Sequence, residues 1–228
     1  MAGDIITKMV DKKKIVFLVA MGFEVEKMFQ SNGFIKSAKK TVFPIYEKDD
    51  LGLVEIGVSK TMAAAGAQWA ISNFETERWV NVGLCGSLNN ELGFGDVVEV
   101  GECRFHDLDV RGLNPECKIG QVSPDQEYIY KLKDHFGLKK AKCITGDIFV
   151  NERPKLKEII EEYSPDVVEM ELTAIAQVMK VNGQLSKLSS LKVVSDKAND
   201  EAGSDFDNIE ERLFEKIKKF VSQITSSI

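Results

Sequence analysis

The sequence lacks any apolar run approaching the roughly 18 residues that a membrane-spanning helix needs. Its four cysteines lie far apart with no C-x-x-C pair, which excludes a dense disulfide framework and a zinc site of that type. Only two histidines are present, so a metal site built from several imidazoles is excluded. Because acidic residues outnumber basic ones by 36 to 30, the chain also lacks the basic excess that nucleic-acid binding favours. We therefore expect a cytoplasmic protein with reduced thiols that binds neither nucleic acid nor membrane.

The N-terminal region imitates a secretory signal, since Lys12, Lys13 and Lys14 precede an apolar segment at residues 15–21. We interpret that segment as a buried first strand, because β-branched residues dominate it and Glu24 and Glu26 follow closely. A chain of 228 residues with 43% apolar residues fits one large domain. The prediction is an N-terminal extension at residues 1–13 and a single catalytic domain at residues 14–228.

Short apolar runs alternate with helical patterns along the chain. Strands are predicted at residues 14–20, 41–46, 53–57, 79–82, 96–105, 141–145, 167–168 and 191–195. Helices are predicted at residues 61–73, 154–163 and 171–181, with a C-terminal amphipathic helix that carries Ile209, Leu213, Ile217, Phe220, Val221 and Ile224 on one face. Because several strands are apolar throughout, both of their faces should be buried. The pattern predicts an α/β fold with a mixed, largely parallel central sheet flanked by helices.

Acidic residues recur where the predicted strands end. These residues are Glu24, Asp107, Asp109, Asp147, Glu169, Glu171 and Asp196, with His106 beside them. In open α/β sheets, ligands bind beyond the carboxyl ends of the strands, so the pattern indicates an acidic ligand cleft. Helix capping or a solvated loop remains the alternative for any single residue.

The chemistry of this cleft is narrowed by missing motifs. There is no G-x-x-x-x-G-K-[ST] loop and no G-x-G-x-x-G after the first strand, which disfavours a nucleotide-phosphate or nicotinamide site. The segment Gly83-Leu84-Cys85-Gly86 allows close approach to a flat ligand or a sugar, or forms a set of turns. Cys85 is more consistent with a buried, inert thiol than with a nucleophile. Two separated carboxyl groups suit glycosidic cleavage, and Asp196 at a rigid strand end is the better-placed acid.

Seven segments together resemble one family. They are Ala20-Met21-x-x-Glu24-Val25, Gly57-x-x-Lys60 with Ala63-Ala64-x-Gly66, Asn81-x-Gly83-x-x-Gly86, His106-Asp107-x-Asp109, Thr145-Gly146-Asp147-x-Phe149, Val168-Glu169-Met170-Glu171-x-Thr173-Ala174-Ile175-Ala176 and Ser195-Asp196. Their order and approximate spacing resemble the 5′-methylthioadenosine/S-adenosylhomocysteine nucleosidases of the nucleoside phosphorylase superfamily. The resemblance implies a nucleoside phosphorylase-like three-layer sandwich that hydrolyses the N-glycosidic bond of both nucleosides to adenine and a thio-ribose product.

The resemblance also implies site residues. Asp196 would protonate adenine N7 as general acid and Glu24 would activate the attacking water. The substrate-binding residues would be Glu171 on the ribose hydroxyls, Met170 under the sugar, Phe149 and Phe206 on the base, the Val150 backbone at the base edge, Ser195 holding Asp196, and Gly86. No metal and no organic cofactor is implied. Adenine nucleosides are the expected ligands and a homodimer the expected assembly.

Three positions depart from the family pattern. Leu84 stands where a serine is frequent, Lys192 where an arginine is frequent, and Gly22-Phe23 follows the first Ala-Met pair instead of an acidic pair. A lysine keeps the charge but loses the planar guanidinium fork. Glu169 and Lys60 are interpreted as a structural residue and a solvated helix-start charge, and His106 as a satisfied hydrogen-bonding histidine.

Three alternatives remain open. A purine nucleoside phosphorylase would need phosphate donors, yet none of the five arginines lies inside a glycine turn. A nucleosidase for another 5′-substituted nucleoside, of futalosine type, would keep the same acids. A non-catalytic nucleoside-binding protein would not require Glu24, Glu171 and Asp196 together.

Overall fold

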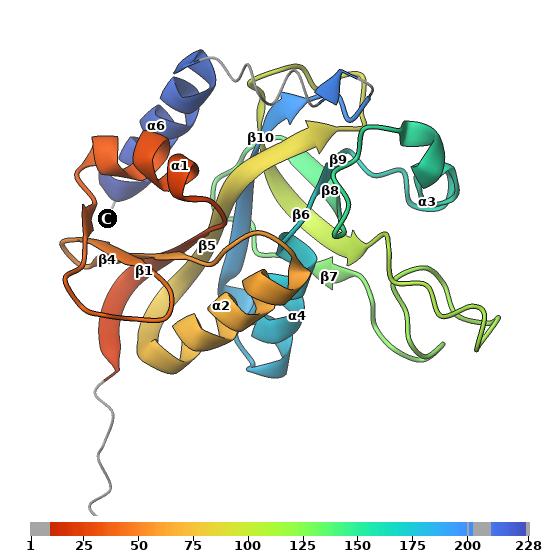
Figure 1. The fold of residues 1–228 in the computed structure, drawn as a ribbon, viewed down its shortest axis with the longest axis horizontal. Coiled ribbons are helices and arrows are strands. Elements are labelled where there is room, and N and C mark those ends of the chain that lie inside the picture. The colour runs from red at the N-terminus through yellow and green to blue at the C-terminus, as the bar shows by residue number, and fades with distance from the viewer. Residues whose placement is uncertain (1–9, 200, 203–210, 227–228) are drawn as a thin grey trace, which may run out of the picture.

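The computed structural model describes residues 10–199, 201–202 and 211–226, and these form an α/β fold (Figure 1). The strands are β1 (Asp11–Val19), β2 (Ile35–Lys36), β3 (Ile45–Lys48), β4 (Leu51–Glu55), β5 (Phe74–Ser87), β6 (Val97–Phe105), β7 (Tyr130–Lys131), β8 (Lys140–Thr145), β9 (Val167–Glu169) and β10 (Leu188–Asp196). The α-helices are α1 (Gly22–Glu24), α2 (Lys60–Asn73), α3 (Lys157–Tyr163), α4 (Leu172–Val181) and α6 (Glu211–Ser226). Shorter helical turns are η1 (Val25–Phe29), η2 (Gln30–Asn32), η3 (Arg153–Leu156) and η4 (Leu185–Lys187).

The first strand shows how the sequence builds three layers. Side chains alternate between the two faces of a strand. Accordingly, Ile15, Phe17 and Val19 pack into one apolar cluster with η1 and α6, whereas Val16 and Leu18 pack into another with α2 and α4. All five side chains are buried. The continuous apolar run was therefore correctly interpreted as a strand with helices over both faces.

Part of the sheet closes on itself. β10 pairs in parallel with β5 and antiparallel with β6, while β6, β8, β9 and β5 follow one another through further pairings. These five strands form a small closed ring, and β1, β4, β3 and β2 extend from β5 as an open sheet. The prediction of a mixed, largely parallel sheet is confirmed. Ring closure adds a feature that periodicity alone does not specify.

Several element boundaries differ from the sequence prediction. β5 has fourteen residues and runs through Gly83 and Gly86, so the glycine-rich segment is a strand and not a set of turns. β1 begins at Asp11, three residues before the predicted strand, and β3 begins at Ile45, inside the segment predicted from residue 41. The helix predicted at 154–163 divides into η3 and α3. The short strands β2 and β7 were not predicted.

The C-terminal helix α6 packs its apolar stripe against η1 and the sheet. Leu213, Ile217 and Val221 are buried there, as their spacing predicted. Ile209 and the side chains of Phe220 and Ile224 lie outside the described residues. In Figure 1, α6 lies near α1, so both ends of the chain contribute to the same helical layer.

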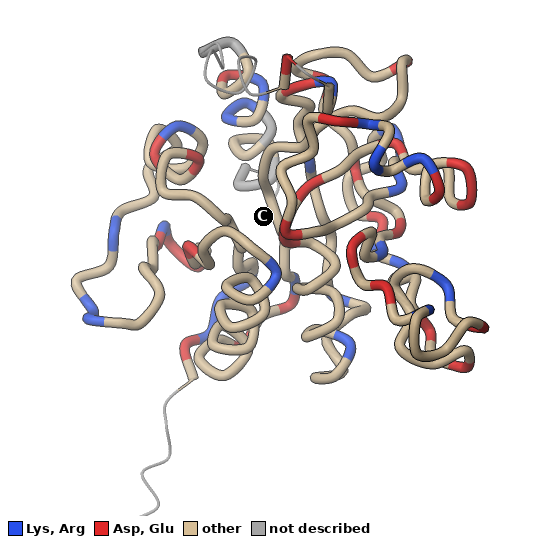
Figure 2. The backbone as a smooth tube through the Cα atoms, turned by 45° about the vertical axis from the view of Figure 1, so that its right-hand side comes forward, with Lys and Arg blue, Asp and Glu red and all other residues tan. Residues whose placement is uncertain are grey.

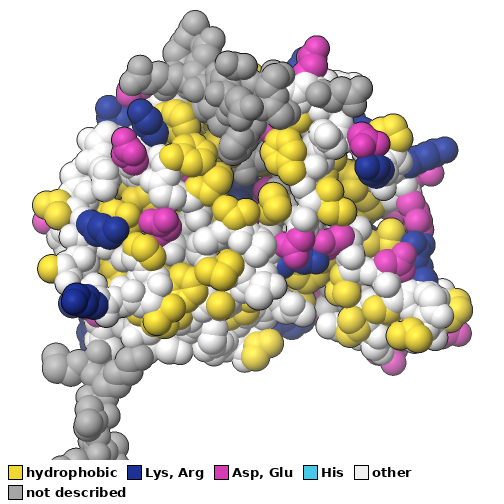
Figure 3. Space-filling model, viewed as in Figure 1, with side chains coloured by type: hydrophobic (Ala, Val, Ile, Leu, Met, Phe, Trp, Pro, Cys, Tyr) yellow, Lys and Arg dark blue, Asp and Glu magenta, His cyan; other side chains and the backbone are white. Residues whose placement is uncertain are grey.

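In the view of Figure 2, Lys and Arg are interspersed with Asp and Glu along the described backbone. Figure 3 shows hydrophobic side chains across the middle of one face of the molecule, close to a group of acidic side chains. Within the part of the chain that the structure describes, no helix has both the length and the apolar character needed to span a membrane.

Candidate active site

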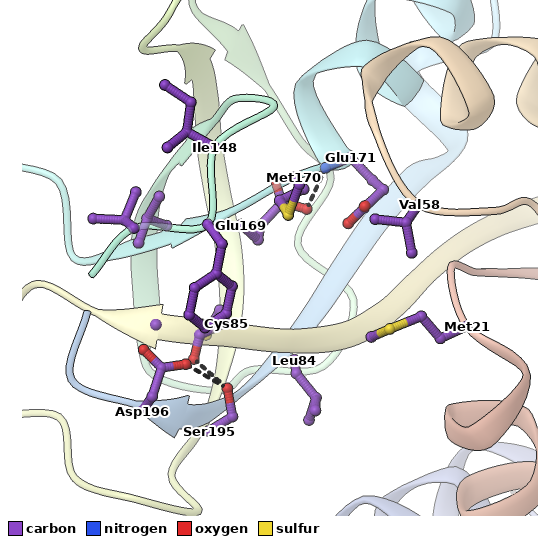
Figure 4. Close-up of a pocket in the computed structure, with 14 residues that line it drawn as sticks. Met21, Val58, Leu84, Cys85, Ile148, Glu169, Met170, Glu171, Ser195 and Asp196 are labelled. Atoms are coloured by element: carbon purple, nitrogen blue, oxygen red, sulfur yellow. Dashed lines mark hydrogen bonds between the residues drawn. The ribbon is translucent and has the colours of Figure 1, made fainter. Parts of the chain in front are cut away.

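A pocket of about 400 Å³ opens at the carboxyl ends of β5, β9 and β10 (Figure 4). Its lining residues are Met21, Val58, Leu84, Cys85, Gly86, Ile148, Phe149, Val150, Val168, Glu169, Met170, Glu171, Ser195 and Asp196. Most of these side chains are apolar, and the polar ones are three acids and a serine. The position agrees with the strand-end rule for α/β sheets. The pocket is therefore the candidate site.

Asp196 and Ser195 form one end of the pocket, at the end of β10 (Figure 4). The Ser195 hydroxyl lies 2.8 Å from Asp196 Oδ2 and 3.2 Å from the Cys85 carbonyl oxygen, and the Ala198 amide donates to Asp196 Oδ1 at 2.8 Å. A hydroxyl has one proton, so Ser195 donates to only one of its two neighbours at a time. Asp196 is thus oriented by neutral groups on both of its oxygens.

Gly86 provides the space that Asp196 occupies. A Cβ atom at position 86 would lie 2.7 Å from Asp196 Oδ1, 3.1 Å from the Ala198 Cβ and 3.3 Å from Val168 Cγ1. The first of these distances is far below an ordinary contact, so any side chain there would displace the carboxylate. This explains a glycine inside a buried strand, where it would otherwise weaken the strand.

Glu171 and Met170 form the other end, directly before α4. The Glu171 side chain points toward the same space as Val58 in Figure 4. Its Oε1 accepts a hydrogen bond from the Ser59 amide at 3.1 Å. Burial, reinforced by the charge of Glu169, raises the pKa of Glu171 to about 7. This carboxyl group can accept hydrogen bonds from a ligand, since one amide occupies only part of its acceptor capacity.

Glu169 and Lys192 form a buried ion pair behind this end. Lys192 Nζ lies 2.9 Å from Glu169 Oε2, and both side chains are 2% exposed. Glu169 also accepts hydrogen bonds from the Leu172 amide at the start of α4 and from the Thr145 hydroxyl. Burial favours the neutral acid, but the Lys192 charge and these donors keep the pKa of Glu169 below its ordinary value. Glu169 is therefore structural, as predicted, and it also lines the pocket.

Glu24 lies beside the pocket, behind the lining residues Met21 and Leu84. Its Oε2 accepts from the Met21 amide at 3.0 Å and its Oε1 from the Leu84 amide at 3.1 Å. The side chain is 1% exposed, and burial raises its pKa to about 7 although Lys192 opposes the shift. A carboxyl group with this pKa exchanges protons near neutral pH, which suits a general base.

Two of the family departures fall within this arrangement. Leu84 presents an apolar side chain to the pocket, and its backbone amide holds Glu24. Lys192 carries the charge expected of an arginine at this position but donates its one described hydrogen bond to Glu169. A Cβ at Gly83 would lie 3.2 Å from Glu24 Oε1 and 3.5 Å from Lys192 Nζ, so the glycine lets both side chains approach β5.

The structure brings together most of the residues chosen from the sequence. Those that line one pocket are Asp196, Ser195, Gly86, Phe149, Val150, Met170 and Glu171, and Glu24 is adjacent to it. Phe206 lies outside the described residues. Sequence reasoning did not assign Met21, Val58, Ile148 and Val168 to the lining. All four lie inside or directly beside the seven segments that resemble the family, and this position could have identified them as lining residues.

Three further residues of the acidic pattern lie outside the pocket lining. Asp109 pairs with Arg111 at 2.7 Å at the surface, where both side chains are at least one-third exposed. Asp107 and Asp147 contact Lys60, which was predicted to be solvated but is instead half-buried in ion pairs. His106 was predicted to be satisfied. Among the described residues its buried Nε2 has no hydrogen-bond partner, and burial lowers its pKa.

Two other kinds of site, one with a cysteine nucleophile and one with a metal ion, are disfavoured by the structure. Cys85 lines the pocket, but burial raises the pKa of its thiol far above the ordinary value, which disfavours a nucleophilic thiolate. Across residues 10–199, 201–202 and 211–226, no group of three or more His, Cys, Asp or Glu side chains is arranged to hold a metal ion.

Comparison with known proteins places the chain in a family. A model of the phosphorylase superfamily matches residues 14–226. A 5′-methylthioadenosine/S-adenosylhomocysteine nucleosidase from Bacillus pumilus is 30% identical over 183 residues, which cover 74% of this chain and 77% of the relative. The chain belongs to the 5′-methylthioadenosine/S-adenosylhomocysteine nucleosidase family of the phosphorylase superfamily.

Solved structures confirm the fold of this nucleosidase family member. A Helicobacter pylori nucleosidase mutant, solved with 5′-methylthioadenosine in its active site, has a TM-score of 0.83 and 20% identity, covering 95% of this chain and 99% of that one. A Helicobacter pylori futalosine hydrolase has a TM-score of 0.82 and 21% identity, covering 95% and 98%. Because the two TM-scores are nearly equal, the backbone does not separate these two activities.

Proposed function

We propose that the protein hydrolyses the N-glycosidic bond of 5′-methylthioadenosine and S-adenosylhomocysteine, releasing adenine and the thio-ribose product. The observation that carries this proposal is the placement of Asp196 and Glu171 at opposite ends of one apolar pocket (Figure 4). Buried Glu24 is held beside that pocket by the amide of the lining residue Leu84. The relationship to the Bacillus pumilus nucleosidase supports the same substrates. Adenine would lie at the Asp196 end and ribose at the Glu171 end.

In this mechanism the three carboxyl groups have separate tasks. Asp196 donates a proton to adenine N7 as the bond between C1′ and the base breaks, so that adenine leaves as a neutral molecule. Glu24 accepts a proton from the water whose oxygen attacks C1′. Glu171 accepts hydrogen bonds from the ribose hydroxyls, which strengthen as the sugar becomes oxocarbenium-like. Protons exchanged with solvent restore Asp196 and Glu24.

The wall residues complete substrate binding. Phe149 stacks on the adenine ring, the Val150 backbone contacts its edge, and Met170 packs under the sugar. All three line the pocket. Aromatic stacking and apolar burial give affinity without charge, which suits a neutral nucleoside.

The residues that line the pocket favour hydrolysis over phosphorolysis as the proposed reaction. A phosphorylase must bind phosphate through cationic side chains or several amides. Among the described lining residues there is no Lys or Arg. The buried ammonium of Lys192, whose partner Glu169 lines the pocket, is held in an ion pair with that carboxylate. The acidic surroundings would repel a phosphate dianion.

The decisive experiment is adenine release from 5′-methylthioadenosine and from S-adenosylhomocysteine, each with and without phosphate. We expect adenine and free sugar at a rate independent of phosphate. Release that requires phosphate and yields a sugar 1-phosphate would identify a phosphorylase. A futalosine-type nucleoside belongs in the same assay because of the near-equal structural likeness to futalosine hydrolase. Hydrolysis of that nucleoside alone would replace the proposed substrates.

We further propose a homodimer that covers the mouth of the pocket. Apolar pocket-lining side chains that are exposed include Ile148 at 56%, Phe149 at 43% and Val58 at 41%. Exposed apolar patches of this kind mark interaction surfaces. Light scattering of the purified protein should give twice the chain mass of 25.4 kDa. A fully active monomer would contradict the dimer.

The cellular setting is part of the same proposal. We place the protein in the cytoplasm, within methionine salvage. The four buried cysteines are free, which fits a reducing compartment. Fractionation of cells should recover adenine-releasing activity with cytoplasmic markers, and recovery outside the cytoplasm would contradict this location.

A further inference from the structure

Three charged side chains outside the pocket join three of the loops that surround it. We call Lys60, Asp107 and Asp147 the Lys60 cluster. Lys60 begins α2, Asp107 follows β6 and Asp147 follows β8. Lys60 Nζ donates to both carboxylate oxygens of Asp107 at 2.7 Å and lies 3.7 Å from Asp147 Oδ2. One ammonium group therefore holds two carboxylates that come from different strands.

Backbone amides tighten the Lys60 cluster. The Lys60 amide donates to Asp147 Oδ1 at 2.7 Å, and the Asp147 amide donates to Asp107 Oδ2 at 2.8 Å. A Cβ atom at Gly146 would lie 2.3 Å from His106 Nε2 and 2.9 Å from Asp107 Cγ. The loops after β6 and β8 are thus in direct contact, without space for a methyl group between them.

The cluster connects to the pocket through the residue before Lys60. The Ser59 amide donates to Glu171 Oε1 at 3.1 Å. Ser59 has φ +96° and ψ 157°, a backbone conformation that favours glycine and costs energy for a serine. Such a conformation persists only where the surrounding contacts impose it. Two consecutive amides, those of Ser59 and Lys60, therefore bind Glu171 and Asp147 on a strained turn.

We propose that Lys60 is a positioning residue for Glu171. By holding Asp107 and Asp147, its ammonium keeps the Ser59 turn in place, and the Ser59 amide then orients the Glu171 carboxylate toward the ribose hydroxyls. This inference rests on the proposed function, because it assigns Glu171 to the sugar. Without the ammonium, the carboxylates of Asp107 and Asp147 repel each other, and the turn relaxes away from Glu171.

The test is a double-mutant cycle of Lys60→Met with Glu171→Gln, read as kcat/KM for adenine release from 5′-methylthioadenosine. We expect Lys60→Met to lower kcat/KM by about five- to thirtyfold in the unsubstituted protein and by less than about twofold in the Glu171→Gln variant. Lys60→Arg, which keeps the charge, should recover most of the loss. Equal losses in both backgrounds would overturn the inference, because Lys60 would then act independently of Glu171.

Calorimetry distinguishes binding of the sugar from binding of the base. It is carried out in the Asp196→Asn background, because the unsubstituted protein would hydrolyse 5′-methylthioadenosine during the titration. In that background Lys60→Met should weaken 5′-methylthioadenosine binding and leave adenine binding unchanged, whereas a parallel loss of both would overturn the inference. Lys157→Met is the matched control, since Lys157 forms an exposed pair with Glu161 on α3. If Lys60→Met does not fold, Asp107→Asn serves in its place with the same expected pattern. Absence of adenine release by the unsubstituted protein would reject the proposed function alone, because the binding ratio still tests Lys60.

Discussion

The two ends of the pocket hold their carboxyl groups by different means. At the Asp196 end, which we propose binds the base and call the base end, the Ser195 hydroxyl and the Ala198 amide, both neutral groups, contact the carboxyl oxygens. At the Glu171 end, which we propose binds the sugar and call the sugar end, Glu171, Glu169 and the nearby Glu24 are buried around the ammonium of Lys192. The carboxyl group at the base end is thus held by neighbouring residues in the chain, whereas the carboxyl groups at the sugar end interact with one another and with Lys192.

This difference determines what a substitution reveals at each end. A change at Asp196 acts directly on one proton donor, whose described partners include the neutral Ser195 hydroxyl and Ala198 amide. A change at the sugar end alters the charge that several carboxyl groups experience. The Lys192 charge lowers the pKa of Glu169, while Glu24 and Glu171 keep pKa values of about 7. The Lys192 ammonium therefore keeps Glu169 ionised, whereas Glu24 and Glu171 can exchange protons near neutral pH.

The largest effect is expected from Asp196→Asn. Removing a positioned general acid typically costs about 10²- to 10⁴-fold in rate, so turnover of 5′-methylthioadenosine should fall by at least that range. Binding should persist, because the asparagine amide keeps the shape and the contact with Ser195. Steady-state kinetics and calorimetry measure the two quantities. Asp109→Asn is the control at an exposed ion pair. Near-normal turnover of Asp196→Asn would remove this residue from the mechanism.

The sugar end should respond most strongly to Lys192→Met. Removing one partner of a buried ion pair leaves an uncompensated charge, which typically costs about 3–5 kcal/mol of unfolding free energy. Glu169 would be left in that state, since both side chains of the pair are 2% exposed. Urea unfolding measures the loss, and adding Glu169→Gln should recover part of it. Lys157→Met, at an exposed pair, should change stability by less than about 1 kcal/mol. Equal effects at the two lysines would contradict a buried charge network.

Stability should also depend on pH through Glu24. Its folded pKa of about 7 lies above the ordinary value of 4.5. When the pKa of a carboxyl group is higher in the folded than in the unfolded protein, its contribution to stability is fully present at pH values below the unfolded pKa. This contribution is lost as the pH rises through the folded pKa. Glu24→Gln should therefore be more stable than the unsubstituted protein at pH 8, by up to roughly 3 kcal/mol, and nearly equal to it at pH 4.5. Urea midpoints at both pH values test this. A stability difference that does not vary with pH would show that burial of the charge is not the cause.

Much of the site could be predicted because its residues follow strands. The rule that ligands bind beyond strand ends selected Asp196, Glu171 and Glu169, and the structure brings them to one pocket although β9 runs antiparallel to β5. The continuous apolar run in β1 was likewise sufficient to predict two buried faces. These features depend on residues that are close together in the sequence, so a local pattern is enough to predict them.

The features that escaped prediction depend on residues far apart in the chain. The pairing of Lys192 with Glu169 requires β9 and β10 to lie on the two sides of β5, and apolar periodicity does not specify strand neighbours. Lys60 was interpreted as a solvated residue. Its partners Asp107 and Asp147 follow β6 and β8, which are distant from Lys60 in the sequence, so the ion pairs could not be predicted. Gly83 and Gly86 suggested turns, but they serve close packing of Glu24 and Asp196 against β5.

The smallest effect concerns the strained turn at the sugar end. Ser59→Gly should raise the unfolding free energy by about 1 kcal/mol, because a glycine adopts φ +96° without the strain of a serine. Two losses offset part of the gain: the weak cap that Ser59 Oγ provides to the Met62 amide at 3.4 Å, and the greater freedom of glycine in the unfolded chain. Ser59→Ala is the matched comparison, since it loses the same cap and keeps the strain, and it should be less stable than the unsubstituted protein. Thermal unfolding of the three proteins orders them. If glycine and alanine proved equally destabilising, the turn would not be strained, and the sugar end would hold Glu171 without stored backbone energy.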